Sequence, residues 1–246
     1  GLEGKGRMAE PEVIVREIRE VFSKKKITEL PLRGRRVFIN AGPTVEPIDP
    51  VRYISNYSSG RMGIAIADMA ARLGADVTLV LGPVTVLPQE KSVTVVPVKT
   101  AAEMKEASVK AFGVCEIAIL AAAVADFTPE TPSATKVKRG DDDLVIRLKP
   151  TDDIAACLGK MKRTGQFLAG FALETDNEME NAMGKLRRKN LDMIILNSLK
   201  DQGAGFGYDT NRVTIIDRNN NIDKFELKSK DEVASDILEK IISLTR

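Results

Sequence analysis

The sequence predicts a doubly wound α/β fold, in which a mostly parallel sheet carries helices on both faces. Three observations favour this fold. Strand-like and helix-like runs alternate from residue 36 to residue 109, and the run Ile117–Val124 carries no charge, as expected of a central parallel strand. Two strand-like runs joined by a polar turn then precede a last amphipathic helix, which predicts a C-terminal β-hairpin and helix.

Residues 1–30 stand apart from the alternating pattern. Pro11 begins a predicted helix, because proline is favoured in a first turn, and Ile14, Ile18, Val21 and Phe22 then share one helical face. Residues 23–34 break this pattern and are typical of a linker. Since one amphipathic helix cannot bury a core of its own, we expect residues 1–30 to belong to another domain and residues 31–246 to form the main one.

The remaining elements follow from periodicity and from residues that start or stop them. Gly74 ends the first helix of the main domain, and Thr100 with Glu103 predicts a capping box. Prolines and charges over residues 127–143 predict a mobile loop. The predicted strands are residues 37–42, 76–81, 93–98, 117–124, 144–148, 167–172 and 193–196, with a hairpin over 212–217 and 222–227. The predicted helices are residues 62–73, 100–109, 154–161, 178–189 and 231–244.

Composition excludes several classes of function. A net charge of +2 argues against a dedicated nucleic-acid binder, and no apolar run approaches the roughly 20 residues of a membrane span. The chain has no histidine, so its chemistry works without an imidazole base or metal ligand. Cys115 and Cys157 lie far apart, which suits a reducing compartment. With no recognisable signal peptide, these features predict a cytoplasmic protein.

The stretch Val51–Gly63 (VRYISNYSSGRMG) is too long and polar for an ordinary connection between a strand and a helix. Ser58, Ser59 and Gly60 come directly before the predicted helix, where unpaired N–H groups and the helix dipole hold anions. The alternative interpretation is that one serine only caps the helix. Neither a dinucleotide fingerprint GxGxxG nor a phosphate-binding P-loop is present.

Other candidate residues have two interpretations each. Asp126 follows the uncharged strand, at the sheet edge where open α/β sheets bind ligands, although an aspartate there can also cap a turn. Lys185 and Lys189 share one helical face, which suits an anion but is also common on surfaces. Lys136–Arg139 (KVKR) is a basic run of the kind that is usually solvated.

These segments together resemble a known family. The motifs NAGPTVEPIDPVRYISNYSSGRMG, AAAVADF, KVKR, GFALET and KLRRKNLDMIILN are similar, in order and spacing over residues 35–246, to those of phosphopantothenate–cysteine ligases. This family is the synthetase half of the bifunctional coenzyme A biosynthesis proteins. The segment GKGRMAEPEVIV resembles the end of the flavin-dependent decarboxylase half, so the resemblance implies a ligase with the decarboxylase's last helix and without its flavin core.

The resemblance implies a Rossmann-like fold and a two-step reaction. CTP and Mg²⁺ activate the carboxylate of 4′-phosphopantothenate as an acyl-cytidylate and release pyrophosphate, and L-cysteine then displaces CMP. A carboxylate is already an ionised nucleophile, so the first step needs no histidine base, but it does need cations to hold a polyanion. The family's active site is shared across a homodimer, which implies a second copy of this chain as partner, besides the decarboxylase domain.

The resemblance assigns roles to individual positions. Lys136 matches a flap lysine that stabilises charge at the α-phosphate, and Asn56 matches the asparagine that contacts the acyl-cytidylate. The substrate phosphate is assigned to Arg52, Ser58, Ser59 and Gly60. The nucleotide is assigned to Ala121, Ala122, Asp126, Lys136, Asp152, Asp153, Phe171, Lys185 and Lys189. No metal ligand is assigned.

One departure and two alternatives stay open at this point. Where many relatives have Asn-Pro-Asp, this chain has Thr151, Asp152 and Asp153, which bears on the choice between CTP and ATP. An NAD(P)-type oxidoreductase of the same fold would need a glycine fingerprint after Ile39, where the chain has Gly42-Pro43. A non-catalytic scaffold would not need Asn56, Lys136 and the two lysines of the 178–189 helix together.

Overall fold

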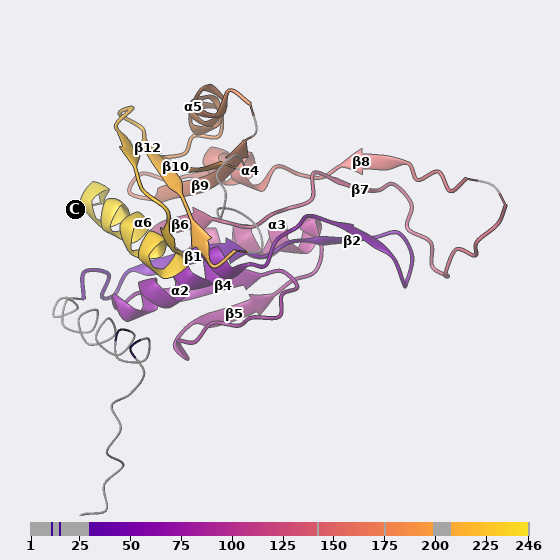
Figure 1. The fold of residues 1–246 in the computed structure, drawn as a ribbon, viewed down its shortest axis with the longest axis horizontal. Coiled ribbons are helices and arrows are strands. Elements are labelled where there is room, and N and C mark those ends of the chain that lie inside the picture. The colour runs from indigo at the N-terminus through magenta and orange to yellow at the C-terminus, as the bar shows by residue number, and fades with distance from the viewer. Residues whose placement is uncertain are drawn as a thin grey trace, which may run out of the picture.

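The predicted fold class is confirmed by a computed structural model, which describes Pro11, Val15 and residues 30–141, 143–174, 176–198 and 208–245. Its main feature is an eight-stranded sheet with the order β13-β12-β10-β9-β6-β1-β4-β5 (Figure 1). Strands β10, β9, β6, β1, β4 and β5 pair in parallel, and β12 and β13 add an antiparallel hairpin at one edge.

The element bounds are as follows. The sheet strands are β1 (Arg36–Ala41), β4 (Asp76–Leu81), β5 (Thr94–Pro97), β6 (Ile117–Leu120), β9 (Phe167–Glu174), β10 (Met193–Ser198), β12 (Val213–Asp217) and β13 (Ile222–Lys224). The short strands are β2 (Val45–Pro47), β3 (Tyr53–Ser55), β7 (Phe127–Pro129), β8 (Leu148–Pro150), β11 (Thr210–Asn211) and β14 (Lys228–Ser229). The helices are α2 (Arg61–Arg72), α3 (Ala101–Phe112), α4 (Ile154–Met161), α5 (Glu178–Arg188) and α6 (Lys230–Leu244).

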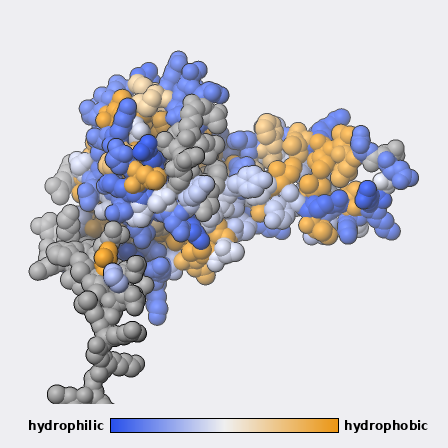
Figure 2. Space-filling model, viewed as in Figure 1, coloured by the Kyte–Doolittle hydropathy of each residue, from blue (hydrophilic) through white to orange (hydrophobic). Residues whose placement is uncertain are grey.

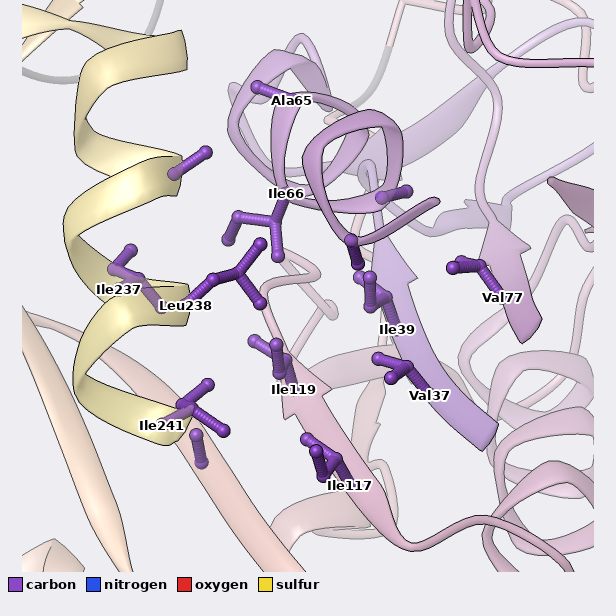
Figure 3. Packing of buried hydrophobic residues seen from close by; sticks show 14 of the residues in the cluster. Val37, Ile39, Ala65, Ile66, Val77, Ile117, Ile119, Ile237, Leu238 and Ile241 are labelled. Atoms are coloured by element: carbon purple, nitrogen blue, oxygen red, sulfur yellow. The ribbon is translucent and has the colours of Figure 1, made fainter. Parts of the chain in front are cut away.

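The two faces of the sheet bury separate apolar clusters, because successive side chains of a strand point to opposite faces. Val37 and Ile39 of β1 belong to the cluster under α2 and α6, whereas Phe38 belongs to the cluster under α3, α4 and α5. Figure 3 shows the first cluster, where Ile66 of α2 and Leu238 of α6 meet above the sheet. Burying this face fixes the position of the start of α2, which matters for the site.

Two hairpins extend away from the sheet as an arm, made of β2, β3, β7, β8 and the connections within each pair (Figure 1). Residues 127–143, predicted to be a mobile loop, thus begin as strand β7, which pairs with β8. The predicted strand 144–148 is wrong, because the ladder covers Leu148–Pro150 and Val145 is 87% exposed. Its partner β7 has only three residues, and one further bond, from the N–H of Glu130 to the carbonyl of Arg147 at 3.0 Å, continues the pairing beyond Pro129.

Several predicted boundaries shift for identifiable reasons. The strand predicted over 117–124 ends at Leu120, because the next backbone N–H groups bond to the Asn40 side chain. Thr100 caps α3 as predicted, but Glu103 accepts from the N–H of Lys99 rather than completing the box. The full capping box lies instead at Ser229 and Glu232 before α6. Apart from Pro11 and Val15, the helix predicted near the N-terminus lies outside the described residues, and so do residues 203–207, a glycine-rich segment (GAGFG) that the sequence suggests is a loop before the hairpin.

Candidate active site

A cavity of about 590 Å³ opens at the carboxyl ends of β1, β6 and β9. From β1 the chain continues outward through β4 and β5, whereas from β6 it continues in the opposite direction through β9 and β10. The neighbouring pair β1 and β6 is therefore the topological switch point, where open α/β sheets form a ligand-binding crevice. The cavity lies where the fold alone predicts a ligand.

Asn40, the fifth residue of β1, holds this crevice open. Its side-chain oxygen accepts hydrogen bonds from the N–H groups of Ala121 at 2.9 Å and Ala122 at 3.1 Å. Asn40 is only 2% exposed, so these bonds are made away from water. They turn the chain out of the sheet after β6 and direct the backbone at Ala121–Val124 along the cavity wall.

The first turn of α2 also lines the cavity. Gly60 is the N-cap residue and has no side-chain cap, while the Ser58 hydroxyl accepts from the N–H of Gly60 at 3.3 Å. The interpretation of a serine as the helix cap is therefore wrong. Gly60 adopts φ of 71°, which favours glycine, and a Cβ at Gly63 would lie 2.4 Å from the Cβ of Ala41. An uncapped helix start packed close against β1 offers N–H groups to an anion.

Asn56 reaches across the crevice from the loop before α2. Its amide nitrogen donates to the carbonyl of Val124 at 2.9 Å, with a longer contact to that of Ala123 at 3.4 Å. The Asn56 side chain remains exposed and lines the cavity. These bonds fix it between the helix start and the backbone after β6.

On the opposite side, lysines meet carboxylates. Lys185 and Lys189 of α5 pair with Glu174 at 2.6 Å and Asp153 at 2.9 Å, and all but Glu174 line the cavity. Asp153 also caps α4 through the N–H of Ala156. Burial opposes ionisation of Asp153, but the bonds from Ala156 and Lys189 outweigh it and lower its pKa. A bound polyanion would compete with these carboxylates for the same ammonium groups.

Twelve of the fourteen predicted site residues line this one cavity. They are Asn56, Ser58, Ser59, Gly60, Ala121, Ala122, Asp126, Asp152, Asp153, Phe171, Lys185 and Lys189. Asp152 additionally pairs with Lys105 at 2.8 Å. The structure thus brings together residues more than 120 positions apart, although contact with a ligand stays a prediction for each of them.

The two remaining residues, Lys136 and Arg52, do not line the cavity. Lys136 is exposed in the loop between β7 and β8, and Arg52 lies between β2 and β3. The Arg52 guanidinium donates to the carboxylate of Asp49 and to the carbonyl of Val137. Both residues therefore belong to the arm.

Asn40, Asn197 and Lys230 are among the cavity residues that the sequence alone did not indicate. Asn40 has the structural role given above. Asn197, at the end of β10, has a buried side-chain oxygen with no hydrogen-bond partner among the described residues. Lys230, at the start of α6, is 8% exposed, and burial together with the nearby charge of Arg61 lowers its pKa. A break in the strand pattern after Leu196 was the only signal for Asn197, and a lysine in a helix start gave none for Lys230.

The described residues contain neither a metal-binding cluster nor a membrane-spanning helix. No group of three or more histidine, cysteine, aspartate or glutamate side chains is placed to hold a metal ion in this part of the chain. Among the helices of the described ranges, none is long and apolar enough to cross a membrane.

Comparisons with known proteins agree on the family. A family profile described as DNA/pantothenate metabolism flavoprotein C-terminal domain matches residues 32–244. The coenzyme A biosynthesis bifunctional protein CoaBC of Bacillus subtilis (strain 168) is 44% identical over 246 residues, which cover 100% of this chain and 60% of that protein. A crystal structure of the C-terminal domain of a CoaBC protein has a TM-score of 0.75 and 41% identity, covering 88% of this chain and 98% of that domain.

A further relative carries a different name. A cysteine/cysteine sulfinic acid decarboxylase from an unidentified prokaryote is 72% identical over 244 residues, covering 99% of this chain and 68% of that protein. The chain therefore spans about two thirds or less of these full-length relatives.

Proposed function

Because the chain belongs to the DNA/pantothenate metabolism flavoprotein C-terminal domain family, we propose that it is a ligase of coenzyme A biosynthesis. It joins 4′-phosphopantothenate to L-cysteine through an acyl-cytidylate made from CTP. The observation that carries this proposal is the single cavity at the switch point, which gathers twelve residues assigned from the family motifs. The cavity offers what the reaction needs, namely cations and open N–H groups facing one space without any histidine.

In the first step, a carboxylate oxygen of phosphopantothenate attacks the α-phosphorus of CTP. The bond from that phosphorus to the β-phosphate bridging oxygen breaks, and pyrophosphate leaves. Lys185 and Lys189 hold the triphosphate by exchanging Glu174 and Asp153 for phosphate oxygens, and the uncapped start of α2 holds a substrate phosphate. Lys136 stabilises the charge that develops at the α-phosphate.

In the second step, the cysteine amine attacks the acyl carbon, CMP leaves, and an amide forms. Asn56 holds the intermediate, because its side chain is already fixed over the crevice by the carbonyl of Val124. The backbone at Ala121 and Ala122, which Asn40 fixes on the cavity wall, contacts the intermediate.

Mg²⁺ fits this site as a phosphate-bound ion. Magnesium is commonly held by one or two carboxylates together with substrate phosphates, so a dedicated cluster of protein ligands is not needed. Asp126 offers an exposed carboxylate on the cavity wall. When bound, the ion neutralises phosphate charge and favours pyrophosphate as leaving group.

The arm supports the proposal of a homodimer. Figure 2 shows orange, hydrophobic surface on the extension. The exposed large hydrophobic residues of the arm are Val51, Tyr53, Phe127, Leu144, Val145 and Leu148. Exposed apolar surface of this kind marks interaction sites. Since Lys136 and Arg52 do not line the cavity of their own chain, we propose that each arm reaches the cavity of the second copy.

The proposal extends to domain organisation. Residues 31–246 form the ligase domain, and residues 1–30 are the last helix and linker of a flavin-dependent decarboxylase domain that supplies the remaining length of the bifunctional relatives. No flavin is expected within residues 31–246. We place the enzyme in the cytoplasm.

The test is pyrophosphate release from the purified chain with phosphopantothenate and Mg²⁺, with CTP or ATP, before and after L-cysteine is added. We expect CTP-dependent release, with turnover and CMP when cysteine is present. Release with ATP alone would keep the ligase and overturn the choice of CTP. No release with either nucleotide would overturn the ligase, and binding of NAD(P)H would then test the oxidoreductase alternative.

A second candidate is favoured by the 72% identical relative named as a cysteine/cysteine sulfinic acid decarboxylase. The same assay distinguishes it, because ligation releases pyrophosphate, whereas decarboxylation releases CO₂ from cysteine or cysteine sulfinate without a nucleotide. CO₂ release by the purified chain, with no pyrophosphate, would replace the ligase proposal.

A further inference from the structure

One buried carboxylate connects the two hairpins of the arm. Asp49 is 3% exposed and accepts hydrogen bonds from the N–H groups of Val51 and Arg52, both at 2.8 Å. It also accepts from the Arg52 guanidinium and from the N–H of Val137 at 3.1 Å. Hydrogen bonding by Arg52 is the largest cause that lowers the pKa of Asp49, so this carboxylate stays ionised at neutral pH.

The segment around Lys136 is held by both backbone groups of its neighbour. The N–H of Val137 donates to Asp49, and the carbonyl of Val137 accepts from the Arg52 guanidinium at 2.6 Å. Four residues earlier, the N–H of Ser133 donates to the carbonyl of Ile48 at 2.8 Å. The loop is therefore fastened to the turn between β2 and β3 at two points.

Exposure along the loop follows these contacts. From Thr131 to Asp141 every residue is exposed except Ser133 and Val137, the two that reach the β2–β3 turn. The lysines on either side of Val137 are exposed and flank a backbone fixed on the ion pair between the buried Asp49 and the partly exposed Arg52. Because the other residues of the loop are exposed, its position depends on the contacts of Ser133 and Val137.

We propose that Asp49 and Arg52 form a clamp that positions Lys136, so that they act on the reaction through the backbone of Val137. This inference rests on the proposed function, because it assumes that Lys136 acts on the nucleotide. Positioning a charged group is a large part of the catalysis of phosphate chemistry, so an unclamped lysine would be present but misplaced. Arg52 is also assigned to a substrate phosphate, and Asp49→Asn separates the two roles because it leaves Arg52 in the chain.

The first test is independent of ligase activity. Trypsin cleaves after Lys136, Lys138 and Arg139, and cleavage of a native loop follows the population of its open form. In Asp49→Asn we expect cleavage at these three bonds, mapped by mass spectrometry, to be about tenfold faster, as expected for loss of charge-assisted hydrogen bonds. Arg52→Lys keeps the charge but loses the forked contact, so its cleavage rate should be intermediate.

Asp68→Asn is the matched control. Asp68 is a buried carboxylate of α2 that accepts from the N–H groups of Gln89 and Glu90, away from the arm. Its loss should leave cleavage after residues 136–139 unchanged. Equal acceleration in both variants would mean general loosening and would overturn the clamp, and so would an unchanged cleavage rate in Asp49→Asn.

The second test asks whether the clamp acts through the lysine. Pyrophosphate release is compared among Asp49→Asn, Lys136→Gln and the double variant. If Asp49 acts only by positioning Lys136, the double variant is no slower than Lys136→Gln alone, and the KM for phosphopantothenate is unchanged in Asp49→Asn. Multiplicative losses would overturn the positioning role. If the wild-type chain releases no pyrophosphate, the proposed function has failed, whereas the cleavage test still decides whether the clamp exists.

Discussion

Asn40 and Asn197 both line the cavity, and we expect their replacement by alanine to change the stability of the protein to different extents. The Asn40 oxygen accepts from two backbone N–H groups, whereas the buried Asn197 oxygen has no partner among the described residues. Asn40→Ala leaves the part-buried N–H of Ala122 without an acceptor. The N–H of Ala121 still donates to the backbone carbonyl of residue 40. Loss of a partner for a buried donor costs about 1–3 kcal/mol.

The magnitude follows from these bonds. Asn40→Ala removes two hydrogen bonds and opens a small space, so we expect a loss of about 2–3 kcal/mol in the free energy of unfolding. For a chain of this size that lowers Tm by about 4–12 °C. Asn197→Ala removes an unsatisfied buried oxygen and should change stability by less than about 0.5 kcal/mol.

The assay is thermal unfolding followed by circular dichroism, with pyrophosphate release measured on the same samples. We expect Asn40→Ala to lose both stability and activity, and Asn197→Ala to lose activity with little change in Tm. If Asn197→Ala is as unstable as Asn40→Ala, the account of the Asn197 oxygen as a cavity group without a protein partner is refuted. An unchanged Tm in Asn40→Ala would refute the account of how the crevice is held open.

Three further outcomes are expected. Asn56→Asp should let the acyl-cytidylate accumulate, because it replaces the amide that donates to the carbonyl of Val124 with a negatively charged carboxylate. Quenched-flow analysis of the intermediate checks this, and normal turnover would contradict it. Gly60→Ala should cost about 1–2 kcal/mol and raise the KM of a substrate phosphate, since φ is 71° and the new Cβ would lie 2.8 Å from Val84; unchanged Tm and KM would argue against the helix start as anion site. The lowered pKa of Asp153 gives stability that is present above its unfolded value of 3.8 and is lost as pH falls through the folded value; Asp153→Asn, which keeps the cap, should therefore differ from wild type in Tm at neutral pH, and the difference should shrink as the pH falls below 3.8.

Much of the fold could be predicted because its signals are local. Uncharged runs such as Ile117–Leu120 and Phe167–Ala172 are buried on both faces, and Gly74 ends α2 as expected. The arm escaped prediction because β2, β3, β7 and β8 have only three residues each, too few to show a period. Strand β8 was placed too early since Leu144, Ile146 and Leu148 alternate, although the ladder depends on a partner that periodicity cannot identify.

The site residues also divide into those that a local sequence signal indicates and those that depend on contacts between distant segments. Ser58, Ser59 and Gly60 could be proposed from the chain alone because an anion site at a helix start is local. The bond from Ala121 to Asn40 joins residues 81 positions apart, and the clamp on Val137 joins residues 85 and 88 positions apart. Contacts of this kind have no sequence pattern, so Arg52 was assigned to a phosphate with no sign of its bonds to Asp49 and Val137.

The packing of α6 on α2 has a consequence for the folding of the chain during its synthesis. Ile66 and Leu238 meet in the core (Figure 3), yet roughly 170 residues separate them in the sequence. Lys230 of the same late helix lines the cavity. During synthesis from the N-terminus, the apolar face of α2 that packs on α6 stays exposed until α6 has left the ribosomal exit tunnel. The crevice is thus completed only after α6 has emerged, and a product that stops before α6 leaves the Ile66 face uncovered.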